Sequence, residues 1–211
     1  MNVLLVNGSP HANGCTYTAL VEIATTLNAE GIDAEIFQVG TNPLAGCIAC
    51  HKCAETGRCI FSDRVNEFLD LAKDADGFIF GSPVHYAAAG GAITSFMDRV
   101  FYAGARSNDR SFYLKPAAAI VSARRAGTTA TFDQLNKYFT ISEMPVIASR
   151  YWNMVHGARP EEVQQDLEGL QTMRVLARNM AWFLKCKEAG QQAGVPWPLQ
   201  EAKIFTNFIR E

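Results

Sequence analysis

The sequence lacks any apolar run long enough to span a membrane. Its first residues already follow a strand pattern, which leaves no room for a signal peptide ahead of them. A clustered basic face, which nucleic-acid binding requires, is also missing, because 19 Lys and Arg residues against 21 Asp and Glu residues give a net charge of −2. We therefore expect a cytoplasmic protein whose partners are neither membranes nor nucleic acids.

Features that divide a chain into several domains are absent as well. The sequence has no Ser/Gly-rich linker, no charge run, no internal repeat and no low-complexity segment. Charged residues make up only 19% of the chain, whereas hydrophobic residues make up 48%, enough to build a large core. The composition predicts one globular domain, assigned to residues 1–189, with a cysteine-rich insertion at 46–59 and a tail at 190–211.

The loop after the first apolar run lacks the lysine of a nucleotide-binding P-loop. Five residues separate Gly8 from Gly14, and Cys15 stands where that lysine would be. The dinucleotide-binding pattern G-x-G-x-x-G is absent too. Small residues here link a buried strand to a helical pattern and deliver backbone N–H groups and hydroxyls to a helix N-terminus. This suits a terminal phosphate; the alternative is an ordinary strand-to-helix turn.

Two separated motifs carry a resemblance to a known family. The first is G-S-P-x-x-x-G-x-T at residues 8–16, and the second is G-S-P-V-H-Y at residues 81–86, followed by F-M-D-R at residues 96–99. Their order and spacing resemble the flavodoxin-like NAD(P)H-dependent FMN reductases over most of residues 1–185. In that family the first motif binds the FMN phosphate and the second lies against the flavin ring. Relatives usually carry Asn at the position of Cys15 and often Arg at that of His11.

The resemblance implies roles for particular residues around the flavin. His85 is a candidate proton donor to the reduced flavin, although backbone amides can serve that edge as well. Arg124 or Arg125, in the loop after the fourth strand, would stabilise negative charge on the reduced ring, unless that loop is only a solvated basic turn. Asp98 and Arg99 are expected to make structural or subunit contacts. The expected cofactor-binding residues are Ser9, His11, Gly14, Cys15, Thr16, Pro83, Val84, His85, Tyr86, Ser122, Arg124, Arg125 and Gly127.

Short apolar runs alternate with helical patterns along the chain, which is typical of a parallel sheet covered on both faces. Together with the resemblance, this predicts an α/β, flavodoxin-like, doubly wound sheet of five parallel strands in the order 2-1-3-4-5, with ligands at the carboxyl ends of the strands. The predicted strands are 2–7, 33–39, 77–81, 117–122 and 144–149, and the predicted helices are 16–30, 63–74, 91–103, 129–141 and 160–187.

Four of the six cysteines lie within thirteen residues, with the spacing C-x2-C-x2-C-x5-C. In a cytosolic protein this density suggests a metal or redox role before a structural disulfide. The spacing resembles that of the iron–sulfur flavoproteins, a branch of the same family that binds a [4Fe–4S] cluster next to FMN. Free or redox-active thiols and a zinc site remain as alternatives. The expected cluster ligands are Cys47, Cys50, Cys53 and Cys59.

The C-terminal tail is too apolar to be simply solvated. Gly190 to Gly194 is predicted to break the last helix, and Trp197, Ile204, Phe205 and Phe208 follow. The tail either packs back on its own domain or contacts a second subunit. Members of the resembled family are usually dimers, so we expect the contact with a second subunit, in a homodimer or higher homo-oligomer.

The function implied is an FMN-dependent oxidoreductase that passes electrons from NAD(P)H to a small acceptor such as a quinone or free flavin. An alternative is an electron carrier that links FMN and a [4Fe–4S] cluster to a redox protein such as ferredoxin. A third possibility is a non-catalytic redox or metal sensor based on the cysteine segment.

Overall fold

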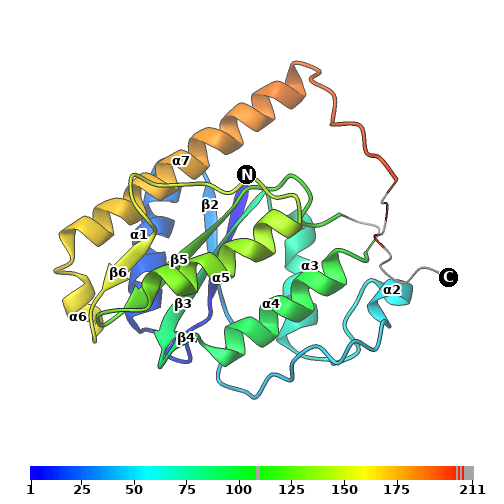
Figure 1. Ribbon diagram of the computed structural model, residues 1–211. Coiled ribbons are helices and arrows are strands. Elements are labelled where there is room, and N and C mark those ends of the chain that lie inside the picture. The colour runs from blue at the N-terminus through cyan, green and yellow to red at the C-terminus, as the bar shows by residue number, and fades with distance from the viewer. Residues whose placement is uncertain (108–109, 203, 205, 207–211) are drawn as a thin grey trace.

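The computed structural model describes residues 1–107, 110–202, 204 and 206 and contains a parallel sheet with helices on both faces (Figure 1). The five main strands follow the order β2-β1-β3-β5-β6, and each neighbouring pair is parallel. A short strand, β4, pairs antiparallel with the end of β3. The predicted flavodoxin-like order is therefore confirmed. The strands are β1 (Asn2–Asn7), β2 (Asp33–Gln38), β3 (Gly77–His85), β4 (Ala88–Ala89), β5 (Ala117–Ala123) and β6 (Met154–His156).

Helices α1 (Cys15–Ala29) and α7 (Leu167–Gln192) cover one face of the sheet, and α3 (Arg64–Asp74), α4 (Gly91–Gly104) and α5 (Thr128–Ile141) cover the other (Figure 1). Alternate strand residues feed the two cores, which is why the central strands β1, β3 and β5 are largely apolar and buried, whereas the edge strand β2 carries charged residues. On β1, Val3 and Leu5 pack beneath α1 and α7, whereas Leu4 and Val6 pack beneath α3 and α4. Two short helices, α2 (Cys53–Thr56) and α6 (Pro160–Val163), complete the described fold.

The fifth strand was predicted at 144–149, and that position is wrong. Within this run only Val146 bridges to β5, at Ala117, and the chain then leaves the sheet. It returns at Asn153, whose carbonyl accepts a hydrogen bond from Val121 N and whose side chain donates to Ala119 O. The edge strand thus pairs with β5 at both ends of β5, and the exposed residues 148–152 bulge out between them.

The single helix predicted over 160–187 is divided in two. Asp166 ends the first turn and caps α7, since its side chain accepts a hydrogen bond from Gly169 N at 2.9 Å. An aspartate at this position stabilises a new helix start rather than a continuous helix. At the other end, α7 runs through Gly190 to Gln192, so the predicted break begins only near Gly194, whose φ of +80 lies in the left-handed region.

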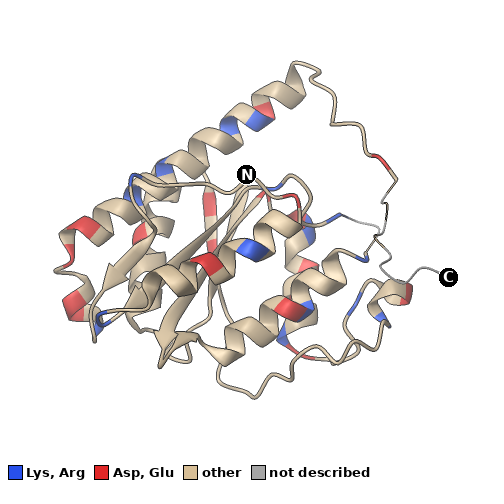
Figure 2. Cartoon of the chain, in the orientation of Figure 1, with Lys and Arg blue, Asp and Glu red and all other residues tan. Residues whose placement is uncertain are grey.

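Acidic and basic residues are interspersed over the helices of the described chain (Figure 2). Among the described residues, no helix combines the length and the apolar character needed to cross a membrane.

Candidate flavin site and cysteine pocket

The N-terminus of α1 leaves its first backbone N–H groups without a side-chain partner in the described chain. Gly14 is the N-cap, has extended backbone angles and makes no side-chain capping hydrogen bond. The first turn also carries no acidic residue. An uncapped helix start of this kind attracts an anion through its N–H groups and its dipole. The structure thus has free helix N–H donors that can bind an anion at the place where the sequence predicts a phosphate site.

Two residues that the sequence analysis did not single out stabilise the loop after β1, at residues 8–14. Asn7 ends β1 and donates to Gln38 Oε1 at 2.6 Å, while Gln38 ends β2 and donates to Ser9 O at 2.7 Å. Ser9 N donates in turn to Asn7 Oδ1 at 3.1 Å, and Ser9 Oγ accepts from His11 N at 3.1 Å. The sequence signal that could have found them is a polar residue at the end of each of two predicted parallel strands. The loop is therefore fixed before any ligand binds.

The first turn of α1 is also tied to the ends of β5 and β6. Thr16 is buried, with 1% of its surface exposed, and its Oγ1 lies 2.8 Å from Ser122 Oγ. Cys15, only partly exposed, donates from Sγ to Gly157 O at 3.4 Å, and burial raises the pKa of its thiol. Thr16 and Ser122 therefore join the start of α1 to the end of β5 within the predicted site, while His11 is exposed on its rim.

The second motif forms a hairpin at the same edge of the sheet. Strand β3 continues to His85 and turns back through β4, with Val84 opposite Ala89. Tyr86 lies at the tip with φ +61 and its whole side chain exposed. A non-glycine residue held in this region of backbone space is strained, and such strain is concentrated at functional sites. Pro83 and Val84 are half-buried, whereas His85 is exposed.

Gly127 brings the loop after β5 against this hairpin. Its φ of +93 favours glycine, and a Cβ at this position would lie 2.9 Å from Val84 Cγ1. Arg124 and Arg125, just before it, are exposed. The negative charge of Glu162 lies near Arg124. The pKa of Glu162 is lowered mainly by a hydrogen bond from Ala158 N, and the charge of Arg124 is one of the smaller causes.

The close approach of Gly8, just after β1, to β3 and α4 gives a first testable prediction. Gly8 N donates to Gly81 O at 2.9 Å, and a Cβ on Gly8 would lie 2.7 Å from Ile93 and 2.8 Å from that carbonyl oxygen. Gly8→Ala should therefore lower the free energy of unfolding by about 1–3 kcal/mol, the usual cost of overpacking. Urea denaturation checks this against Gly91→Ala, whose Cβ would meet nothing within 4 Å. Equal free energies of unfolding for the two variants would contradict this close approach.

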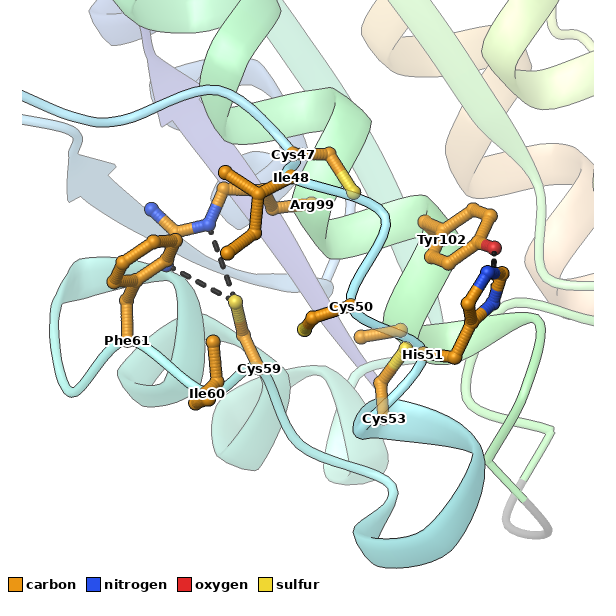
Figure 3. Close-up of a pocket in the computed structure, with 11 residues that line it drawn as sticks. Cys47, Ile48, Cys50, His51, Cys53, Cys59, Ile60, Phe61, Arg99 and Tyr102 are labelled. Carbon is orange, nitrogen blue, oxygen red and sulfur yellow. Dashed lines mark hydrogen bonds between the residues drawn. The ribbon is translucent and has the colours of Figure 1, made fainter.

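All four clustered cysteines line one small pocket between the cysteine segment and α4 (Figure 3). Cys47 and Cys50 are exposed, Cys59 is half-buried and Cys53 is buried at the start of α2. Burial raises the pKa of the Cys53 thiol. The free cavity is about 20 Å³, so the side chains nearly close it. The remaining lining residues are Ile48, His51, Ile60, Phe61, Arg99, Tyr102 and Ala103.

The thiols share this pocket without closing around a single point. Within the described residues, no group of three or more His, Cys, Asp or Glu side chains is arranged to hold a metal ion. Structural zinc requires four donors in a tight tetrahedron. In a [4Fe–4S] cluster each of four thiolates binds its own iron, so the four sulfurs lie farther apart. Four cysteines on one pocket are the donor set that a [4Fe–4S] cluster takes, so the chemistry of the lining suits that group.

Asp98 and Arg99 point to different neighbours within the chain. The Tyr138 hydroxyl donates to Asp98, and burial together with this carboxylate raises the pKa of Tyr138. Arg99 is buried and reaches the cysteine pocket, where it contacts Cys59 and Asp63. The sequence analysis expected structural or subunit contacts here, because nothing in the local pattern links α4 to the cysteine segment.

A profile of the NADPH-dependent FMN reductases matches residues 1–159 of the chain. The chain belongs to this family. An iron–sulfur flavoprotein of Methanocaldococcus jannaschii is 31% identical over 194 residues, which cover 88% of this chain and 98% of that relative. RosB, solved with bound 8-demethyl-8-formylriboflavin-5'-phosphate, aligns over 100% of this chain and 94% of its own at 13% identity, with a TM-score of 0.68. An archaeal flavodoxin with 16% identity aligns over 88% of this chain and 99% of its own, with a TM-score of 0.59.

Membership of the FMN reductase family confirms the resemblance and makes the protein an FMN flavoprotein oxidoreductase. The two solved structures share its fold. The predicted site residues gather in two places. Those from the loops after β1, β3 and β5 meet at the carboxyl edge of the sheet, and the four cysteines meet beside α4.

Proposed function

We propose that the protein binds FMN at the carboxyl edge of the sheet, accepts electrons from NAD(P)H and passes them to a small acceptor such as a quinone or free flavin. The observation that carries this proposal is the meeting of an uncapped helix start with the hairpin of β3 and β4. Gly8 N donates to Gly81 O, and a Cβ on Gly81 would lie 2.8 Å from Thr16 in the first turn of α1, so the helix start lies beside β3, which leads into the hairpin. Family membership supports both FMN and the nicotinamide donor.

The chain's own residues would bind and orient the cofactor. The N–H groups of the first turn of α1 would hold the phosphate, and Ser9 would keep the loop closed around it. Val84 and Tyr86 would lie against the ring, while Arg124 and Arg125 would offset its negative charge when it is reduced. FMN itself supplies hydride acceptance and one-electron transfer. His85 is open to solvent, so water can exchange protons with it.

We further propose that Cys47, Cys50, Cys53 and Cys59 hold a [4Fe–4S] cluster, so that the protein can also serve as an electron carrier for a redox protein such as ferredoxin. Three findings support this: the donor chemistry, the single pocket that all four thiols line, and the naming of relatives as iron–sulfur flavoproteins. Helix α4 begins beside the hairpin, since Gly90 N donates to Ser82 Oγ. Arg99 in the pocket lies eight residues beyond Gly91, the first residue of α4, which is about 12 Å along the helix at 1.5 Å per residue.

Stopped-flow spectroscopy under argon distinguishes the two roles. Rapid bleaching of the flavin by NADPH or NADH, followed by turnover with a quinone, is the result expected of the oxidoreductase. Fast reduction by reduced ferredoxin, with no response to either nicotinamide, would instead establish the carrier. If neither donor reduced the bound flavin, both roles would be wrong.

The tail remains the proposed contact with a second subunit. Trp197 is 55% exposed and Ile204 is 92% exposed, whereas Phe205 and Phe208 lie outside the described residues. Lys187 Nζ lies 5.5 Å from the Trp197 ring, so the tail starts by folding over α7 and still leaves apolar surface in water. Burying each large side chain would contribute about 1.5–3 kcal/mol.

Truncation after Gln192 should therefore weaken self-association. Light scattering at micromolar concentration should give a dimer or larger species for the full chain and a smaller species for the truncated one. A monomeric full chain would refute the contact.

A further inference from the structure

We propose that Arg99 is a positioning residue that holds Cys59 as a cluster ligand and raises the reduction potential of the cluster. Asp63 is its partner in this role. The inference depends on the [4Fe–4S] cluster proposed above. It assigns a function to the one charged side chain that is fully buried in the wall of the cysteine pocket, 1% exposed.

Every N–H group of the Arg99 guanidinium has an acceptor on the segment from Ala45 to Asp63. Nε and Nη2 each donate to Cys59 Sγ at 3.2 Å. Nη2 also donates to Asp63 Oδ1 at 2.9 Å, and Nη1 donates to Asp63 Oδ2 at 2.8 Å and Ala45 O at 3.3 Å. These contacts use the five donors that a guanidinium has. Arg99 therefore fixes the position of Cys59 relative to α4 (Figure 3).

Stability alone does not account for a charge in this position. Replacing a buried ion pair by apolar side chains is often neutral or stabilising, because both charges must be taken out of water. Here the Phe61 ring lies 4.8 Å from Arg99 Cζ and could pack against an apolar side chain equally well. The charge is explained if it serves the sulfur it contacts.

Two donors on one sulfur suit a metal-bound thiolate. A protonated thiol is a weak acceptor, whereas a sulfur that carries negative charge accepts strong, charge-assisted hydrogen bonds. Net charge and hydrogen bonds to the sulfurs are among the properties that set the potential of a cluster. A guanidinium beside Cys59 favours the reduced cluster, which has one more negative charge. The Asp63 carboxylate, which holds the guanidinium in place, has the opposite effect and favours the oxidised cluster.

These opposite charges give opposite predictions for two variants, each of which replaces a charged group by a neutral amide. Arg99→Gln removes the positive charge and should lower the midpoint potential of the cluster. Asp63→Asn removes the negative charge and should raise that potential, while an asparagine can still cap α3. A purely structural pair would lower the cluster content in both variants and leave no opposite shifts. Asp63 is 28% exposed, so water can solvate it when Arg99 is replaced.

The test begins with iron and sulfide assays on anaerobically purified wild type, followed by redox titration of the cluster monitored by electron paramagnetic resonance. We expect Arg99→Gln to shift the reduction equilibrium about tenfold towards the oxidised cluster, which is about 59 mV for a one-electron couple. Asp63→Asn should shift it the other way. Arg99→Lys keeps the charge but not the paired donors, so its potential should fall between wild type and Arg99→Gln.

Arg58→Gln is the matched control, because it removes the same charge next to Cys59 in sequence while its guanidinium donates to Asp70 instead. It should keep the wild-type potential. Wild-type potentials in both Arg99 variants would overturn the inference and leave the cluster intact. Shifts of the same sign in Arg99→Gln and Asp63→Asn, or cluster loss in all three variants, would also overturn it. A wild type without iron would instead overturn the proposed cluster itself.

Discussion

Replacing Cys50 by Ser is expected to remove almost all iron and sulfide from the protein while leaving FMN bound. A serine hydroxyl is a poor ligand for iron compared with a thiolate, so the cluster loses one of its four corners. Cys50 is exposed and lies outside the helices and strands, so the substitution should cost little stability. The flavin loops are built from other segments and should be unaffected. Iron and sulfide assays on anaerobically purified protein, with flavin measured by absorbance, provide the readout.

Cys186→Ser is the matched control for this experiment. Cys186 is also an exposed cysteine, but it lies on α7 across the sheet from the cysteine pocket. This variant should keep the iron content of the wild type. Wild-type iron in Cys50→Ser would contradict the ligand assignment, and loss of flavin together with iron would contradict the separation of the two sites.

Cys15→Asp is expected to weaken FMN binding by about 30- to 150-fold, whereas Cys15→Asn should bind nearly as well as wild type. Both side chains have almost the same shape, so the pair isolates the charge. A carboxylate at the first residue of α1 would add a negative charge to the turn whose N–H groups are proposed to hold the phosphate, and would repel it by about 2–3 kcal/mol at the effective dielectric of a protein surface. Cys15 donates to Gly157 O and an aspartate cannot, so urea denaturation of the flavin-free variants is needed to show that the loss of FMN does not come from unfolding.

Fluorescence titration of the flavin-free protein measures this effect. Riboflavin, which lacks the phosphate, provides an internal control and should bind equally to both Cys15 variants. If the aspartate variant kept wild-type affinity for FMN, or lost affinity for FMN and riboflavin alike, the phosphate would not lie at the start of α1.

The positions of most strands and the loop at residues 8–16 could be predicted from sequence because their signals are local, whereas the strand order came from the family resemblance. Apolar runs separated by helical patterns define parallel strands, and the loop 8–16 has its own composition. The edge strand could not be placed, since its position depends on Asn153, a polar residue that pairs with β5 by a backbone and a side-chain hydrogen bond. An apolar run at 144–149 was the stronger local signal and was misleading.

The support around each site was also out of reach of the sequence. Asn7 and Gln38 are 31 residues apart, and Arg99 and Cys59 are 40 apart, so only the fold brings them together. The cysteine spacing showed a candidate ligand set but not the charged pair behind it. Long-range polar contacts leave no periodic pattern in a single sequence, whereas core faces and helix caps do.

A crystal structure of the FMN-loaded protein tests the central assignment most directly. The phosphate should accept hydrogen bonds from backbone N–H groups in the first turn of α1, and the ring should lie against Val84 and Tyr86, close to Gly127. A flavin bound elsewhere on the chain, or a phosphate that avoids the start of α1, would contradict the account.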